Sequence, residues 1–313
     1  MAKTVPAPPR EVRIAGAPAL AVRVREPEFA EDGAPGPPIV LVHALGRTLE
    51  DWEAMTPLLT RRHPLYAIDL RGHGRSEDGA WTLDGLLDDL IRVIGHFGLE
   101  RPVVVGHQLG GMLAVAYGAR SSRLTAVVNI EGHGWPHAKD VSERLGLSLE
   151  EAEGHVAAFR RYVVEQVSCT LAPMPPGAFD RMVEAYRSGV MGLPGPVLAA
   201  SALRSAVIAD GVVSPRPGPR AARALCSAFD PFDPDLHYRE LKTPALTLVS
   251  TAPAATPPGA PARFSEILTI QAEHELIPRG DHLPSRGVDA HYAMHMSHPE
   301  RVTWLIEDFL AGI

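Results

Sequence analysis

The sequence has few cysteines, no cluster of basic residues and no long hydrophobic run, and each of these features excludes a class of protein. Two cysteines, Cys169 and Cys226, cannot form a disulfide framework in a chain of 313 residues, and their spacing matches no zinc motif. The 30 basic residues form no cluster that would bind phosphate groups, and the net charge is −7. No apolar run approaches the length that spans a bilayer. We therefore expect a cytoplasmic protein that acts on a small molecule, without nucleic-acid or membrane partners; a homodimer is left open.

Short apolar runs alternate with helical patterns through the first 130 residues. Strands that are apolar on both faces belong to a parallel sheet covered by helices. An N-terminal hairpin is expected before them, and the apolar spacing after Thr82 predicts a helix that ends at Gly98. The predicted strands are residues 39–43, 65–70, 102–107 and 124–131, and the predicted hairpin is 11–16 with 20–26.

The alternation stops after Glu131. Residues 136–238 contain helical stretches and no convincing strand, whereas strand character returns at 244–250 and an amphipathic helix begins at Pro299. We predict an α/β core that is interrupted by a helical cap. The expected boundaries are residues 1–135 for the first part of the core, 136–237 for the cap and 238–313 for the second part of the core.

Five motifs in sequence order resemble landmarks of the α/β-hydrolase superfamily. They are VHALGRTLEDW (42–52), AIDLRGHGRSED (67–78), VVVGHQLGGM (103–112), VVNIEGHG (127–134) and HMSHPERVTWLIEDFL (295–310). The resemblance implies the α/β-hydrolase fold, with a mostly parallel central sheet flanked by helices and a helical cap inserted after the sixth strand.

The third motif resembles the turn that carries the family's nucleophilic serine. In the G-x-S-x-G pattern, this turn joins a strand to a helix and exposes the serine oxygen. Gly106 and Gly110 keep the flanking glycine positions, but Gln108 stands where the serine is expected. An amide side chain neither attacks carbon nor titrates near neutral pH. The resemblance therefore implies an intact turn that has lost its nucleophile.

The other two members of the triad are irregular too. Glu131 is the candidate acid, because the segment after the later strand offers none; the alternative is a carboxylate that only accepts hydrogen bonds at a strand end. The family's histidine lies on the loop before the last helix, where this sequence has Tyr292 with His291 beside it. His282 is a second candidate. At neutral pH a tyrosine is a weak base, because its usual pKa is about 10.

The resemblance also implies an oxyanion hole, which would bind a negatively charged oxygen. Its donors would be the backbone N–H groups of Leu45 and Leu109, and these depend on backbone position rather than on side-chain type. Ala44 replaces the family's usual glycine beside Leu45. The residues expected to line the substrate pocket are His43, Ala44, His107, His133 and Trp135, although His43, His73 and His107 are also explained as packing or turn residues. We expect no metal and no cofactor, because no ligand spacing supports one.

Three functions are compatible with an amide at this turn. The first is an enzyme that performs cyclisation, C–C bond formation or elimination without an acyl-enzyme. The second is a catalytically silent ligand-binding or regulatory protein. The third is a hydrolase whose nucleophile was replaced, or one that uses a water activated by Glu131. Because both the serine and the histidine position depart from the pattern, we favour the first. The composition and the family resemblance suggest actinobacterial secondary metabolism.

Overall fold

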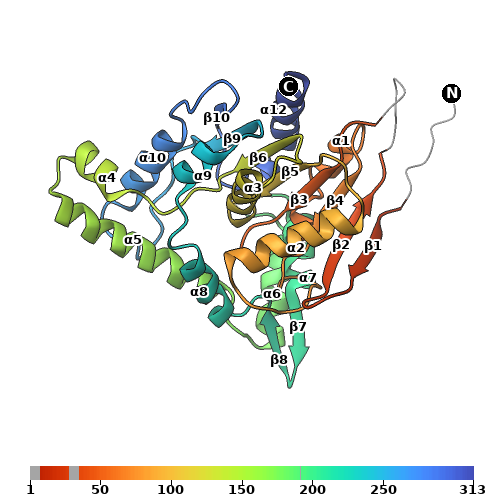
Figure 1. Ribbon diagram of the computed structural model, residues 1–313. Helices are drawn as coiled ribbons and strands as arrows, with labels where there is room; N and C mark the ends of the chain where they lie inside the picture. The colour runs from red at the N-terminus through yellow and green to blue at the C-terminus, as the bar shows by residue number, and fades with distance from the viewer. Residues whose placement is uncertain (1–7, 28–34, 191) are drawn as a thin grey trace.

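A computed structural model describes residues 8–27, 35–190 and 192–313, and its centre is an eight-stranded sheet (Figure 1). The strand order is β1-β2-β4-β3-β5-β6-β9-β10. The strands are β1 (Arg10–Ile14), β2 (Leu20–Arg25), β3 (Ile39–Val42), β4 (Leu65–Ile68), β5 (Val103–His107), β6 (Ala126–Ile130), β9 (Ala245–Ser250) and β10 (Ser285–Val288). Strand β2 is antiparallel to both of its neighbours, and the pairs from β4 to β10 are parallel. The expected N-terminal hairpin and the mostly parallel sheet are therefore confirmed.

Helices cover both faces of the sheet. Alternate strand residues point to opposite faces, so Val40 and Val42 pack in one hydrophobic cluster and Ile39 and Leu41 in the other. The first cluster includes side chains of α2 (Leu83–His96) and α3 (Leu109–Arg120). The second includes side chains of the 3-10 helix η1 (Leu49–Trp52), α1 (Thr56–Leu59) and α12 (Pro299–Ala311). The short helix α11 (Met294–Ser297) precedes α12.

Two helix ends follow the predicted signals. The Thr82 hydroxyl accepts a hydrogen bond from the Gly85 N–H at 3.1 Å, which caps α2, and Gly98 follows this helix with a positive φ of 59°. Helix α12 begins at Pro299, and its residues Val302 and Ile306 are buried. No helix within the described residues is long and apolar enough to cross a membrane.

The segment between β6 and β9 is mostly helical, and Figure 1 shows it beside the sheet. Its helices are α4 (Ala138–Leu145), α5 (Leu149–Thr170), α6 (Pro176–Arg187), α7 (Gly195–Ser205), α8 (Pro219–Ala228) and α9 (Pro234–Glu240). We call residues 136–237 the cap. The expectation that the cap contains no strand is wrong, because β7 (Ala206–Ala209) and β8 (Val212–Pro215) form an antiparallel hairpin.

The turn of this hairpin explains the error. Asp210 and Gly211 both have positive φ, at 51° and 73°, as the two-residue turns that match the twist of a hairpin require. The apolar spacing of residues 196–208 favoured one continuous helix, but the helix ends at Ser205 and the chain reverses through Asp-Gly.

The cap is attached at the carboxyl ends of the core strands. Arg204 of α7 donates from Nε to Oδ2 of Asp69, directly after β4, at 2.8 Å, and Arg204 is also hydrogen-bonded to Glu11. The hydroxyls of Ser201 and Thr48 lie 3.0 Å apart. A second contact packs α4 and α5 against α10 (Phe264–Glu275), a core helix. These contacts hold the cap next to the strand ends where α/β sheets place their sites.

Candidate functional site

The turn between β5 and α3 has the backbone of a nucleophile elbow. Gln108 has φ 46° and ψ −111°, a conformation that residues with a side chain rarely adopt. The neighbouring glycines are required sterically: a Cβ atom on Gly106 would lie 2.0 Å from the Gly110 carbonyl oxygen, and one on Gly110 would lie 2.1 Å from the Val42 carbonyl oxygen. The close approach of β3, β5 and α3 therefore depends on both glycines and leaves the partly exposed Gln108 at the strand end.

Two backbone donors flank this turn. The Leu109 N–H is the first of α3, and the Leu45 N–H follows the carboxyl end of β3. Among the described residues, neither N–H has a hydrogen-bond partner. The Leu45 side chain packs against the cluster that contains Leu109, and Ala44 is buried. The role of these two N–H groups as oxyanion donors stays a prediction, and the helix dipole of α3 favours negative charge at Leu109.

Glu131 lies beside Gln108 on the neighbouring strand. His107 and Ile130 are register partners of β5 and β6, so Gln108 and Glu131 are the next residue on each strand, and the Gln108 N–H donates to the Ile130 oxygen at 2.8 Å. Glu131 also has a positive φ, 57°. The structure therefore places two non-glycine residues with positive φ next to each other at the strand ends, and such strain persists mainly where it serves function.

The carboxyl group of Glu131 is almost fully buried and has two neighbours. Oε1 accepts a hydrogen bond from the Ser250 N–H, and Oε2 lies 3.6 Å from Nε2 of His133. Burial raises the pKa of Glu131, although the nearby His133 and the Ser250 N–H oppose this shift. The His133 side chain keeps 18% exposure. A buried carboxylate beside an accessible imidazole is an arrangement that can orient a general base.

Tyr292 lies next to the elbow, on the loop that follows β10. His107 donates from Nε2 to the Tyr292 carbonyl oxygen at 2.9 Å, and the two rings stack with centroids 6.3 Å apart. Tyr292 is 43% exposed, and the burial of the rest of the residue raises the pKa of its hydroxyl above the usual value. Its hydroxyl is consequently neutral at physiological pH, so it can donate a hydrogen bond but is a poor base.

A second buried histidine, His295, packs against His107 and was not identified from the sequence. The two ring centroids lie 4.3 Å apart, and neither His295 nitrogen has a hydrogen-bond partner in the described residues. Burial lowers the pKa of His107 to about 4 and that of His295 well below its usual value. Both imidazoles are therefore neutral at physiological pH. The sequence signal was weak, because His295 belongs to a helical segment whose neighbours are apolar.

Arg47 is a further residue near the elbow that the sequence reasoning did not single out. It forms a bidentate ion pair with the buried Asp51, from Nε to Oδ2 at 2.7 Å and from Nη2 to Oδ1 at 2.8 Å. Its Nη2 also lies 3.9 Å from Sδ of Met296. Its i,i+4 spacing to Asp51 could have revealed the pair, although not its place beside the α11 segment.

Two predicted pocket residues, His43 and Trp135, make structural contacts, and so does the nearby His73. His43 uses both ring nitrogens: Nδ1–H donates to the Ala44 oxygen at 2.7 Å and Nε2 accepts the Leu70 N–H at 3.0 Å. His73 similarly links the Arg71 oxygen and the Gly46 N–H. Trp135 donates to Asp230 of the cap at 3.2 Å, and Arg160 lies over its ring. The alternative of packing or turn roles thus describes the contacts of His43 and His73.

The two histidine candidates near the chain's end, His282 and His291, lie at opposite ends of strand β10. His282 precedes β10, and its carbonyl accepts the N–H of Ala245, the first residue of β9, at 2.9 Å. It therefore lies at the amino ends of the parallel strands, whereas the elbow lies at their carboxyl ends. His291 is exposed on the loop after β10, on the elbow's edge. The structure does not bring His282 to Gln108, because β10 separates the two ends.

Comparison with known proteins identifies the fold. The sequence model of the family described as "alpha/beta hydrolase fold" matches residues 37–160. An E-2-(acetamidomethylene)succinate hydrolase has TM-score 0.71 at 18% identity and covers 97% of this chain and 99% of its own. An esterase from Thermogutta terrifontis has TM-score 0.59 at 24% identity, with 97% and 98% covered. The chain has the α/β-hydrolase fold, and its residues 37–160 match the sequence model of that family.

Curated relatives match a shorter part of the chain. The 1-acylglycerol-3-phosphate O-acyltransferase ABHD5 of Sus scrofa is 32% identical over 114 residues, which are 34% of this chain and 33% of that protein. The dihydrolipoyllysine-residue acetyltransferase component of the acetoin cleaving system of Pseudomonas putida is 26% identical over 159 residues, 50% of this chain and 41% of that protein. The matches thus span between a third and about two fifths of these relatives.

Proposed function

We propose that this chain is an enzyme that stabilises an oxyanion without forming an acyl-enzyme, and that it catalyses cyclisation, C–C bond formation or elimination on a small organic substrate. The observation that carries the proposal is the pair of adjacent strained residues, Gln108 and Glu131, beside two backbone N–H groups that have no partner among the described residues. The proposed place in secondary metabolism rests on the composition and the family resemblance.

In this proposal the backbone donors stabilise negative charge, and the Glu131–His133 pair removes a proton. The N–H groups of Leu45 and Leu109 would bind the carbonyl oxygen of the substrate and stabilise the negative charge of an enolate. His133 would donate its Nε2–H to Glu131 and accept, at Nδ1, a proton from the carbon next to that carbonyl. The electron pair of the C–H bond then forms the enolate, and the Glu131 carboxylate stabilises the imidazolium.

Gln108 orients the substrate in this mechanism and forms no covalent bond. Its amide offers donors and an acceptor at the position where the family exposes a nucleophile. In this proposal Tyr292, rather than His291 or His282, takes the position of the family's histidine and supplies a neutral hydroxyl. A nucleophile and its base are thus replaced by two hydrogen-bonding groups, which favours bond-forming or eliminating chemistry over acyl transfer.

Proton exchange at an activated carbon tests the mechanism without knowledge of the natural substrate. In D₂O, the protein should speed deuterium incorporation between the carbonyls of simple 1,3-dicarbonyl esters, followed by NMR. Glu131→Gln and His133→Asn should each lower this rate by about 100-fold, the lower range for a positioned general base. His96→Asn, a change at an exposed histidine of α2, should leave it unchanged. Binding without exchange would instead favour a ligand-binding protein.

Ester hydrolysis provides the complementary test. The wild-type protein should show negligible turnover of aryl esters, and Gln108→Ser should remain inactive, because the tyrosine at position 292 is a poor base. Robust hydrolysis by the wild type that disappears in Gln108→Ala would contradict the proposal. An active Gln108→Ser variant would mean that His291, on the same edge of the sheet, can reach the elbow as a base.

A further inference from the structure

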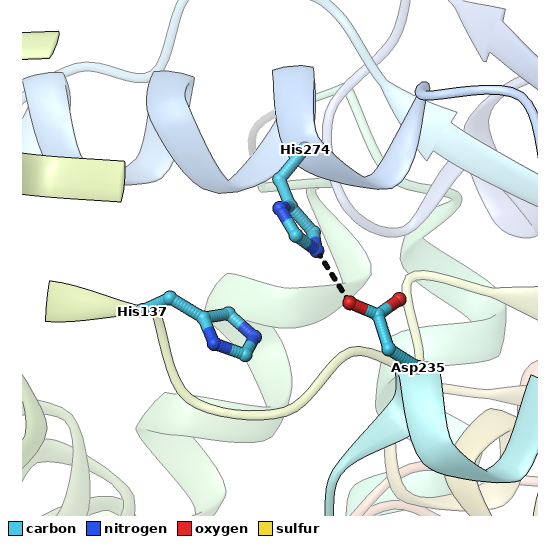
Figure 2. A group of neighbouring side chains, drawn as sticks. All are labelled: His137, Asp235 and His274. Atoms are coloured by element: carbon cyan, nitrogen blue, oxygen red, sulfur yellow. Dashed lines mark hydrogen bonds and ion pairs between the residues drawn. The ribbon is translucent and has the colours of Figure 1, made fainter. Parts of the chain in front are cut away.

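Two histidines and an aspartate from three separate elements converge where the cap meets the core (Figure 2). His137 directly precedes α4, Asp235 lies in the first turn of α9, and His274 lies in the last turn of α10. One potential ligand atom from each lies within 4.8 Å of the other two. None of these residues belongs to the elbow site.

His274 is held by carboxylates on both sides of its ring. Nε2 lies 3.1 Å from Oδ2 of Asp235, and Nδ1 lies 2.8 Å from Oδ2 of Asp140. Histidines that bind a metal through one nitrogen characteristically donate the other N–H to a carboxylate, which fixes the ring orientation. Asp140 has this relation to His274, which leaves Nε2 directed toward Asp235.

The other two potential ligands, Asp235 and His137, have different surroundings. Arg279 binds Oδ1 of Asp235 through Nε and Nη2, both at 3.1 Å, so Oδ2 is the oxygen that faces the histidines. The exposed His137 ring stacks on His274 with centroids 5.0 Å apart, and no hydrogen bond holds it among the described residues. The ring can therefore turn without breaking a hydrogen bond within the described residues.

The surroundings offer both negative charge and space. The carboxylates of Asp140, Asp235 and Glu275 outweigh the single guanidinium of Arg279, which also pairs with Glu275. Before the histidines are counted, these groups sum to two negative charges, which a divalent cation would balance. A cavity of about 10 Å³, lined by His137, Asp140 and His274 among others, adjoins the cluster and is about the size of one water.

We propose that His137, Asp235 and His274 bind one Zn²⁺ ion, with a water in the fourth position. Two imidazole nitrogens, one carboxylate oxygen and a water form a tetrahedral donor set that zinc accepts. In the complex, Nε2 of His274 would bind the ion and its Nδ1–H would donate to Asp140. The ion would link three elements: the start of α4 at the beginning of the cap, helix α9 near the end of the cap, and core helix α10.

Metal titration of the whole protein tests this site. We expect one Zn²⁺ to bind by calorimetry, one Co²⁺ to give the visible absorption of a tetrahedral complex, and Zn²⁺ to raise the melting temperature. His137→Ala should abolish the cobalt spectrum without unfolding the protein, because this side chain is exposed. Asp140→Asn should weaken zinc binding by about 10- to 100-fold, as expected for a group that orients a ligand.

The matched control is His96→Ala, which removes an exposed histidine from α2 and should leave zinc binding unchanged. Failure of the wild-type protein to bind zinc, or equal binding by wild type and His137→Ala, would overturn the proposal. Neither result would contradict the function proposed for the elbow, because proton exchange and metal binding are measured separately.

Discussion

The backbone around the elbow and the side chains around it differ in how closely they keep the family pattern. The backbone keeps the glycines that allow β3, β5 and α3 to approach, and two of its N–H groups have no partner in the part of the chain that the structure describes. An amide stands at the serine position, Tyr292 is one candidate for the histidine position, and two buried neutral histidines lie nearby. The fold itself requires the backbone arrangement, whereas the side chains at the strand ends can change without loss of the fold.

The largest effect should come from acid, which tests whether the buried histidines serve in packing rather than in proton transfer. In the unfolded chain a histidine protonates near pH 6.5, but burial lowers the pKa of folded His107 to about 4. Between these values the unfolded state binds more protons, so the free energy of unfolding falls as the pH falls. His107 alone accounts for about 3 kcal/mol of this loss, and His43, His73 and His295 shift in the same direction.

Denaturant unfolding between about pH 7 and about pH 4 measures this loss. His295→Leu removes one titrating group and two unpaired ring nitrogens, so its stability should depend less steeply on pH than that of the wild type. His96→Leu removes an exposed histidine and should keep the wild-type slope. A wild-type stability that does not decline over this range would show that the buried histidines titrate normally.

The second effect tests the backbone directly. In Gly106→Ala the new methyl group would lie 2.0 Å from the Gly110 oxygen, so β5 and α3 must move apart. We expect a loss of about 3 kcal/mol in the free energy of unfolding, at the upper end for overpacking. Gly95→Ala is the matched control, because nothing lies within 4 Å of its Cβ position in α2. That change should stabilise the protein by up to about 1 kcal/mol.

The sequence alone was sufficient to predict most of the fold. The apolar strands, the cap of α2 at Thr82 and the start of α12 at Pro299 are local signals, and the structure agrees with each. The β7–β8 hairpin was missed because two residues, Asp210 and Gly211, decided it against a longer apolar helical pattern. Local turn chemistry can thus reverse a periodicity that extends over a dozen residues.

The site was less predictable, because its parts come from distant segments. The motif order located Gln108 and Glu131, but their adjacency follows from the register of β5 and β6. His282 resembled a catalytic loop by its neighbours in sequence, yet β10 places it at the opposite edge. His274 meets His137 and Asp235 only through the packing of α4, α9 and α10, so no spacing along the chain indicated the cluster.

The smallest effect separates backbone strain from side-chain chemistry at one residue. Gln108 holds φ 46° and ψ −111°, a conformation that costs about 1 to 3 kcal/mol in a residue with a side chain. Gln108→Gly should relieve this strain, and after the entropy that glycine adds to the unfolded chain we expect a gain of about 1 kcal/mol. Gln108→Ala keeps a Cβ atom and should not gain stability.

Denaturant unfolding of the two variants distinguishes them, and equal stability would mean that the elbow is not strained. A more stable but inactive Gln108→Gly variant in the proton-exchange assay would indicate that the amide, and not the turn alone, is needed for function.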